Sequence, residues 1–222
     1  NHGASPLYAA AQQGHIEVVN ALLARGDIDI NKADTNGFTP LIIAAQEGHT
    51  EIVKALLARG DIEINKALTN GATPLFAAAL NGHTDVAKAL LGRGEIEINK
   101  ARTDNGASPL HAAALNGHTE VLNALLARGD IEINKSLRSG ATPLYYAAQN
   151  GHTEIVKALL TKVGIDINKA RTDGATPLYA AAQQGHIEVV NALLRKGDIE
   201  INQSDADGET PLYVAALNGH TE

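Results

Sequence analysis

The sequence contains no cysteine, no methionine and no tryptophan, and its only aromatic residues are two phenylalanines and five tyrosines. Without cysteine the chain forms no disulfide and offers no thiolate to a metal ion. Because cysteine, methionine and tryptophan are absent and aromatic residues are few, the apolar residues are mainly Ala, Leu, Ile and Val. A core of such small and medium side chains suits thin elements that pack closely. The absence of cysteine does not indicate whether the compartment is reducing or oxidising, because a chain without cysteine tolerates both conditions.

Long apolar runs and an excess of basic residues are absent as well. No apolar run approaches the ~20 residues that a membrane-spanning helix needs, and no secretory signal pattern is visible. The net charge is -7, with acidic and basic residues interspersed. We therefore expect no membrane insertion and no nonspecific binding to nucleic acid, which requires a basic surface. An intracellular location is the default expectation.

The feature that dominates the sequence is a tandem repeat. The eighteen residues from Pro6 to Leu23 recur unchanged from Pro177 to Leu194. A Thr-Pro or Ser-Pro dipeptide recurs along the whole chain, with its proline at Pro6, Pro40, Pro74, Pro109, Pro143, Pro177 and Pro211. Five of these intervals are 34 residues and one is 35, and a Gly-His dipeptide follows each proline at the same distance. We therefore expect one array over residues 1–222. Its units are expected at approximately 1–33, 34–67, 68–101, 102–136, 137–170 and 171–204, with a partial unit at 205–222.

The first half of each unit carries the signals of a short helix. In the third unit, NGATPLFAAALNGHTDVAKALLGRGEIEINKA, Thr73 can accept hydrogen bonds from the free amides of a first turn. Pro74 suits the first helical position, where a missing N–H costs nothing. Gly82 can adopt the positive φ that ends many helices. The pattern predicts a helix that begins at Pro74 and ends at Gly82.

The second half predicts a second helix, an extended stretch and a turn. Val86, Leu90 and Leu91 have helical spacing, and Gly94 is expected to close this helix. The segment EIEINKA (95–101) alternates apolar and polar residues, which predicts an extended conformation. Asn-Gly, as at residues 70–71, is a strong turn signal. Each unit is thus expected to form two helices of about ten residues and a protruding turn.

Helices of this length are unstable alone in water, so neighbouring units must stack to bury their apolar faces. Ala-Ala pairs recur in the first helix of the units, for example at residues 78–79. They keep that helix slim. The slim first helices of neighbouring units can approach one another closely on their side of the array, and the array should therefore curve.

The residue pattern distinguishes between two repeat families of similar period. Tetratricopeptide units place large aromatic residues inside longer helices and a proline at the end, whereas here the proline opens the first helix. The pattern TPL-x-x-AA-x-x-GH-x-x-V/I-V-x-x-LL, followed by I-N, resembles the ankyrin repeat over the whole chain. The resemblance implies an all-α solenoid of stacked helix-loop-helix units with protruding β-turn or hairpin loops.

The sequence also departs from the ankyrin pattern. Each unit is about one residue longer than the usual ~33, and the extra residue lies after the second helix. The histidine that usually follows TPL is present only at His111. Tyr, Ile or Phe takes its place in the other units. Hydrogen bonds that family members make through this histidine are therefore not expected there.

Nothing in the sequence predicts catalysis, a metal site or a cofactor. Seven of the nine histidines occupy the same loop position, one per unit. Units that stack about 10 Å apart hold them too far from one another to share a zinc ion. We expect each to hydrogen-bond local backbone. The acidic pairs such as Asp61 and Glu63 alternate with Ile and are flanked by basic residues, which predicts a solvated surface ladder. No catalytic triad motif, phosphate-binding loop or dinucleotide motif is present.

The resemblance implies a protein partner that contacts the concave face, made of turn tips and the exposed sides of the first helices. Phe38, Ile43 and Tyr146 stand out there, because the equivalent residues are mostly alanine and aromatic anchors dominate binding energy. The positions carried over by register are Asn36, Phe38, Ile43, Gln46, Glu47, Asn70, Leu80, Asn81, Asn105, Leu115, Asn116, Arg138, Tyr146, Gln149, Asn150, Asp173, Gln183 and Gln184.

Two further interpretations remain open. The near-identity of the units also suits a structural array, and neither end shows the polar cap of a finished solenoid. The chain is then expected to be a segment of a longer array, or to associate end to end with other copies. Separately, Leu57 with Glu63, Ile64 and Asn65 resembles the context in which ankyrin-repeat asparagines are hydroxylated.

Overall fold

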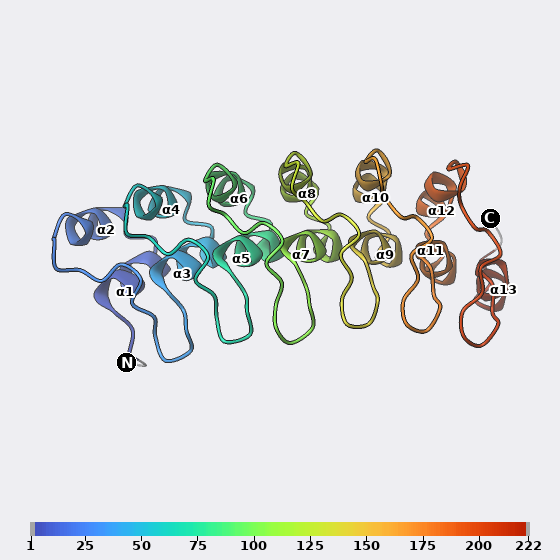
Figure 1. Ribbon diagram of the computed structural model, residues 1–222, viewed down its shortest axis with the longest axis horizontal. Helices are drawn as coiled ribbons and strands as arrows, with labels where there is room; N and C mark the ends of the chain where they lie inside the picture. Colours follow the sequence, from blue (N-terminus) through green and yellow to red (C-terminus); the bar gives the residue numbers. More distant parts are fainter. Residues whose placement is uncertain (1–2, 221–222) are drawn as a thin grey trace.

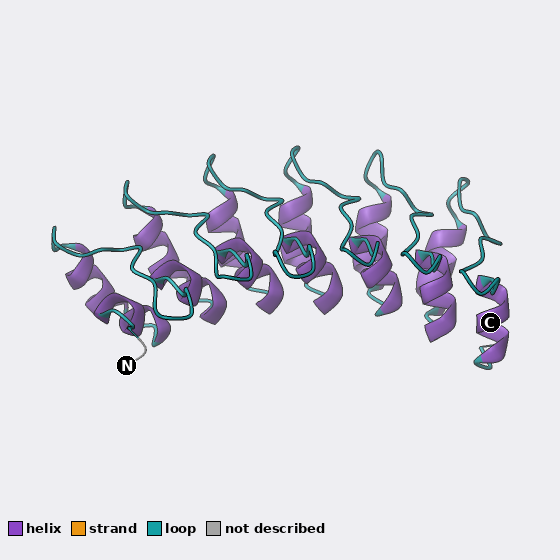
Figure 2. Ribbon diagram, turned by 60° about the horizontal axis from the view of Figure 1, so that its bottom comes forward, coloured by secondary structure: helices purple, strands orange, loops and turns teal. Residues whose placement is uncertain are grey.

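The computed structural model describes residues 3–220, and within them it contains thirteen α-helices and no strand. Figure 1 shows the helices in two rows, with the even-numbered helices above the odd-numbered ones and the long turns below both. Figure 2 shows that the units follow an arc. This arrangement confirms the predicted all-α solenoid and its curvature.

Each of the first six units contributes one helix to each row, and within the described residues the partial seventh unit contributes α13 alone. The odd-numbered helices are α1 (Pro6–Gln12), α3 (Pro40–Glu47), α5 (Pro74–Asn81), α7 (Pro109–Asn116), α9 (Pro143–Gln149), α11 (Pro177–Gln184) and α13 (Pro211–Leu217). The even-numbered helices are α2 (Ile16–Leu23), α4 (Thr50–Leu57), α6 (Thr84–Leu91), α8 (Thr119–Leu126), α10 (Thr153–Leu160) and α12 (Ile187–Leu194).

The ends of the odd-numbered helices follow from the residues predicted to cap them. The Thr73 hydroxyl accepts a hydrogen bond of 3.1 Å from the Phe76 amide, and Pro74 occupies the first helical position. Gly82 ends the helix with a φ of 75°, in the left-handed region. A residue with a Cβ is disfavoured there. The predicted start and end of this helix are confirmed.

The even-numbered helices end earlier than predicted. α6 ends at Leu91, and its C-cap is Gly92 in a right-handed conformation, so the expectation that Gly94 closes it is wrong. The helices contain seven or eight residues instead of about ten. No left-handed glycine follows Leu91, and a basic side chain of the next unit binds the end of the helix instead. Nη1 of Arg128 donates a hydrogen bond of 2.8 Å to the carbonyl of Leu91, the last residue of α6.

The same cross-unit bond recurs at every interface between even-numbered helices. The other donors and acceptors are Arg59 to Leu23, Arg93 to Leu57, Lys162 to Leu126 and Lys196 to Leu160. A cation at a helix C-terminus also interacts favourably with the helix dipole. The basic residues predicted to form only a solvated ladder therefore also join neighbouring units.

The segment 95–101 does not form the predicted extended stretch. The Lys100 amide donates to the Glu97 carbonyl over 3.1 Å, which folds the chain into a tight turn. Ile96 and Ile98 are both buried. The turn is held from the preceding unit by Asn65, whose side-chain amide donates to the Glu95 carbonyl (2.7 Å) while its Oδ1 accepts from the Glu97 amide (2.9 Å).

This asparagine bridge is repeated along the array. The equivalent bridges start from Asn31, Asn99, Asn134 and Asn168. Each one satisfies a backbone donor and a backbone acceptor of the next unit. Side-chain amides carry both functions, whereas a carboxylate can only accept. The recurrence of Asn in this position is therefore explained by its bonding across the interface.

The loop histidines bond across units, and the expectation that they bond local backbone is wrong. Nε2 of His83 lies 2.8 Å from the carbonyl oxygen of Gln46 in the preceding unit, and because a carbonyl only accepts, Nε2 donates. A Cβ placed on Gly48 would lie 2.6 Å from Nδ1 of the same ring. The glycine of one unit thus makes room for the histidine of the next. The equivalent bonds start from His49, His118, His152, His186 and His220.

The core is a continuous strip between the two rows, without a centre. Leu75, Ala78, Val86 and Leu90 of the third unit are fully buried, and buried residues of every unit from the first to the sixth belong to the same cluster. Each unit is buried by the units beside it, as expected for a solenoid.

Candidate protein-interaction site

The turn tips and the exposed sides of the odd-numbered helices form one surface, which we name the turn–helix face. It is the surface that the sequence predicts to be concave. The tips are joined to each other, because the Thr103 amide donates a hydrogen bond of 2.8 Å to the Asn70 carbonyl of the preceding unit. The same bond joins Arg138 to Asn105, Thr172 to Ser139 and Ala206 to Asp173. The tips are therefore held in register by backbone hydrogen bonds.

Several predicted partner residues at the tips are engaged in their own turns. Oδ1 of Asn70 accepts from the Ala72 amide (3.0 Å), and Oδ1 of Asn105 accepts from the Ala107 amide (2.9 Å). Asp173 accepts in the same way from Ala175. These side chains shape the tip and keep part of their polar surface exposed. Asn36 and Arg138 are exposed, and Phe38 is half-buried.

The predicted residues on the helices fall into three groups. Glu47, Leu80, Asn81, Leu115, Asn116, Asn150 and Gln184 are exposed. Gln46, Tyr146, Gln149 and Gln183 are half-buried. Ile43 is only 3% exposed, so its side chain belongs to the core and offers almost no surface to a partner. Ile43 stands out in the sequence because the equivalent residues are mostly alanine, but neighbouring residues cover its large aliphatic side chain.

A pocket lies at the middle of the turn–helix face, where α5, α7 and α9 meet; we name it the central pocket. Its volume is about 100 Å³, and its walls include Leu80, Leu115, Tyr146 and Phe76, with Ala112 between them. Leu80 and Leu115 are 39% and 40% exposed. Within residues 34–170, the only other exposed large hydrophobic side chain is Val163, in the loop after α10.

The polar rim of the central pocket comes from the turn of the fourth unit, and Arg138 of the fifth unit binds this turn from outside the pocket lining. The guanidinium of Arg102 stacks over the Phe76 ring at 5.5 Å from its centroid and pairs with Asp104. Nη2 of Arg138 donates to the Thr103 carbonyl over 2.6 Å, and Arg138 forms no ion pair with any residue in the described range 3–220. Its charge therefore faces solvent without a carboxylate partner.

His111 lines the same pocket and is neutral near pH 7. Burial lowers its pKa from 6.5 to about 4. Nε2 lies 3.3 Å from the Ala141 carbonyl and donates to it, while Nδ1 accepts from the Ser108 amide and hydroxyl. The hydrogen bonds that the family pattern places on this histidine are thus present in the one unit that has it. It caps α7 and bridges to the fifth unit.

Of the residues that line this pocket, the sequence predicted Leu80, Asn105, Leu115 and Tyr146, and it missed the others, among them Phe76 and Arg102. Neither belongs to the positions carried over from the family pattern. One comparison within the sequence points to the pocket, however. The position of Leu80 and Leu115 is glutamine in the first, second, fifth and sixth units. Two leucines in adjacent units at a polar position indicate an apolar patch.

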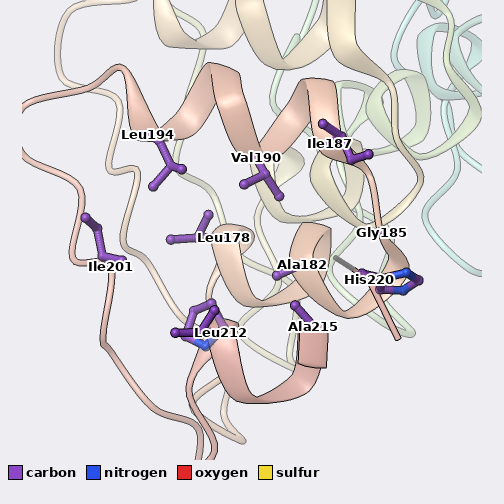
Figure 3. A pocket seen from close by; sticks show the side chains of 11 residues that line it. Leu178, Ala182, Gly185, Ile187, Val190, Leu194, Ile201, Leu212, Ala215 and His220 are labelled. Atoms are coloured by element: carbon purple, nitrogen blue, oxygen red, sulfur yellow. The ribbon is translucent and has the colours of Figure 1, made fainter. Parts of the chain in front are cut away.

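A second hollow lies at the end of the array, between α11, α12 and α13 (Figure 3). It has a volume of about 220 Å³, and Val190, Leu194 and Leu212 lie around it. The residues equivalent to Val190 and Leu194 in the fifth unit, Val156 and Leu160, are buried, because the next even-numbered helix covers them. This hollow is therefore a stacking surface of the repeat and not a separately built ligand site.

Comparisons with known proteins agree with this architecture. The family model described as "Ankyrin repeats (3 copies)" matches residues 1–67, 61–137, 94–171, 130–205 and 164–222. The chain belongs to the ankyrin repeat family. Ankyrin repeats are generally protein–protein interaction modules, not enzymes. A search of curated proteins finds no match.

Solved ankyrin structures resemble the chain over nearly its whole length. The ankyrin repeat domain of human ASB11 is 32% identical, with a TM-score of 0.81, and the match covers 96% of this chain and 92% of that one. The ankyrin repeat domain of Bcl-3, described as a unique member of the IkappaB protein family, is 26% identical, with a TM-score of 0.82 and coverage of 97% and 95%.

Over residues 3–220, no helix combines the length and the apolar character needed to cross a membrane. In the same range no group of three or more His, Asp or Glu side chains is placed to hold a metal ion. His2, which the sequence leaves isolated, lies outside the described residues.

Proposed function

We propose that this chain is a non-enzymatic scaffold that binds a protein partner through the turn–helix face. The observation that carries the proposal is the location of its exposed apolar side chains. In the middle units Leu80 and Leu115 lie on this face, beside the half-buried Tyr146. Exposed apolar side chains that cluster within a polar rim are typical of protein interaction sites.

The rigid backbone of the turn–helix face supports the same proposal. From the third unit to the seventh, each tip is fixed to the next by a backbone hydrogen bond, and the odd-numbered helices are bonded to the neighbouring unit through loop histidines. A surface that is ordered before binding loses little conformational entropy when it binds. The predicted polar positions, such as Asn36, Gln149 and Gln184, would then form the rim of the contact.

Affinity capture with the chain as bait, from its native source, tests the proposal. The paired substitution Phe38→Ala with Tyr146→Ala should reduce capture about tenfold or more. The fold should tolerate both changes, because alanine occupies the equivalent positions at Ala72 and Ala112. Val163→Gln, which removes an exposed apolar side chain elsewhere, serves as the control. Unaltered capture by the paired variant would place the site on another surface.

A structural array is the second candidate, and the end units favour it. Val18 in α2 is 48% exposed and Leu212 in α13 is 74% exposed, although the equivalent residues of the middle units are buried. These side chains are stacking surfaces without a neighbour in the described residues, so end-to-end association of copies would bury them. Sedimentation velocity at several concentrations tests this candidate. A sedimentation coefficient that does not change with concentration would exclude self-association.

A further inference from the structure

We infer that the central pocket binds one large apolar side chain of a partner peptide segment, and that this segment carries a carboxylate next to the apolar residue. The inference rests on the proposed interaction function and names the partner chemistry at that site. The proposed occupant is a segment of a partner protein, and the residues that would bind it all belong to the middle units.

Within the six complete units, leucine stands at the position of Leu80 and Leu115 only in the two adjacent units that form the pocket; the partial seventh unit also has a leucine there, Leu217. Leu80 and Leu115 occupy a position that holds glutamine in four other units. Their exposed fractions, 39% and 40%, show that neighbouring units do not need them for stacking. Burying such surface against a partner contributes about 25 cal/mol for each Å² removed from water. Two adjacent leucines in this position are therefore better explained by a bound apolar group than by the fold.

Tyr146 closes the pocket on the side of the fifth unit. Its position holds Ala77 and Ala112 in the two preceding units, and the small Ala112 side chain leaves the space that the tyrosine overlooks. The Tyr146 ring meets Tyr145 edge-on with a centroid separation of 6.1 Å. Tyr145 is in turn fixed by Arg171. The wall is therefore held in place before a partner arrives, which lowers the entropic cost of binding.

The volume of the pocket sets the size of the group that enters it. About 100 Å³ of accessible space corresponds to several water-sized spheres of roughly 10–15 Å³ each. One side chain such as Leu, Ile, Met or Phe fits this space, whereas a folded helix does not. An extended or turn segment that inserts one side chain is the occupant that matches.

The positive charge beside the pocket specifies which kind of residue of the partner segment lies next to the inserted apolar side chain. The guanidinium of Arg138 uses one donor on the Thr103 carbonyl and has no carboxylate partner within the described residues. Thr103 belongs to the turn whose Arg102 and Asn105 line the pocket. Arg102 is neutralised by Asp104, and His111 is uncharged, so the local charge is positive although the chain carries -7. An aspartate or glutamate of the partner forms a bidentate pair with such a guanidinium.

Selection from a display library of random peptides, with the whole chain as target, tests the inference. The expected consensus has Leu, Ile, Met or Phe with Asp or Glu within about three residues, a reach of about 10 Å in an extended chain. Leu80→Gln with Leu115→Gln should weaken binding of the selected peptides about tenfold or more. Glutamine already stands at the equivalent positions, for example Gln46 and Gln149, so this variant keeps the fold.

A charge reversal separates the two parts of the inference. With Arg138→Glu as target, the consensus should keep its apolar residue and exchange the acidic neighbour for Lys or Arg. Val163→Gln is the matched control and should select the same peptides as the unsubstituted chain. Failure to obtain a consensus, or a consensus that binds both variants equally well, would overturn the inference.

The same peptides distinguish this inference from the proposed function. Peptides that lose affinity with Phe38→Ala but bind the Leu80 and Leu115 variant normally would refute the central pocket and leave the turn–helix face intact. Peptides that lose affinity only with Val163→Gln would refute both, because binding would then occur away from the turn–helix face.

Discussion

The guanidinium of Arg171 lies over the ring of Tyr145, with Cζ 5.3 Å from the ring centroid, and it donates a hydrogen bond of 3.1 Å to the phenol oxygen. The two residues belong to adjacent units and are 26 positions apart. Arg102 over Phe76 repeats this relationship at the same spacing. The other pairs at this spacing are Tyr8 with Asp34, Ile42 with Leu68, His111 with Leu137 and Tyr179 with Asp205. Among units that are otherwise almost identical, these pairs distinguish one interface from the next.

Removal of the Arg171 guanidinium should destabilise the array. Leucine stands at the equivalent positions 68 and 137, so we expect Arg171→Leu to fold but to lower the free energy of unfolding by about 1 kcal/mol, through loss of the cation–π contact and the phenol hydrogen bond. Urea denaturation measures the change. Arg195→Ala, at an exposed basic residue, should leave the midpoint nearly unchanged. Equal effects of the two substitutions would argue against a specific role for the stack.

The Gly48 and His83 contact should appear as a coupling between two substitutions. Gly48 has a φ of +78°, and an added Cβ would meet the His83 ring at 2.6 Å, so Gly48→Ala should cost more than the ~1–2 kcal/mol of the left-handed conformation alone. His83→Ala should cost about 1 kcal/mol through the lost bond to Gln46. The double variant should cost less than the sum, because the clash is gone.

Thermal or urea unfolding of the four proteins in this cycle gives the coupling energy. Gly26→Ala is the matched control, since Gly26 has no positive φ and nothing lies within 4 Å of an added Cβ. It should be neutral or slightly stabilising. Strictly additive losses in the Gly48 and His83 cycle would show that the two residues do not interlock.

The asparagine bridges give a prediction with an internal control. Asn65→Ala removes one donor and one acceptor that bind backbone of the next unit, and we expect a loss of about 1–3 kcal/mol in unfolding free energy. Asn202 occupies the same position in the sixth unit, where it is exposed and makes neither bond within the described residues. Asn202→Ala should therefore have little effect on the urea midpoint. Similar losses at both sites would contradict the bridging role.

His111 should make the stability of the array depend on pH. Burial lowers its pKa in the folded state from 6.5 to about 4, so the unfolded chain binds a proton in a range where the folded chain does not. The contribution of the neutral ring is complete above about pH 6.5 and is lost as the pH falls through 4. The full loss is about 3 kcal/mol. Lys135, whose charge also disfavours the protonated ring, stays cationic throughout.

His111→Tyr tests this dependence, because tyrosine already follows Thr-Pro-Leu at Tyr145 and Tyr179. Carboxylates titrate in the same range in both proteins, so the relevant quantity is the difference between their unfolding free energies at each pH. That difference should change between pH 6.5 and pH 4 in favour of the tyrosine variant. A difference that stays constant over this range would show that His111 is already exposed to solvent.

Much of the fold could be predicted because its signals are local. Thr73, Pro74 and Gly82 act within one helix through caps and backbone conformation, and these predictions are confirmed. The errors concern groups that bond to another unit. Gly94 was expected to close α6, but the helix ends at Leu91, whose carbonyl accepts a hydrogen bond from Arg128 of the next unit. His83 was expected to bond local backbone, but it reaches Gln46 in the preceding unit.

The candidate site was predictable in outline and not in detail. Register within the repeat indicates which positions belong to the turn tips and to the first helices, but not how far neighbours cover each side chain. Ile43 and Tyr146 occupy the same position in their units, yet Ile43 is 3% exposed and Tyr146 lines the central pocket. Phe76 and Arg102 join that pocket only because the turn of one unit lies over the helix of the one before.

The sequence by itself determined the repeat, its period, the helix starts and the need for units to stack, because helix caps and apolar periodicity act over a few residues. Only the tertiary structure decided which polar groups join the units and where apolar surface stays exposed. Hydrogen bonds from Asn65, Arg93 and His83 span about thirty residues or more of chain. Such partners are brought together by packing alone, and no local pattern encodes the distance between them.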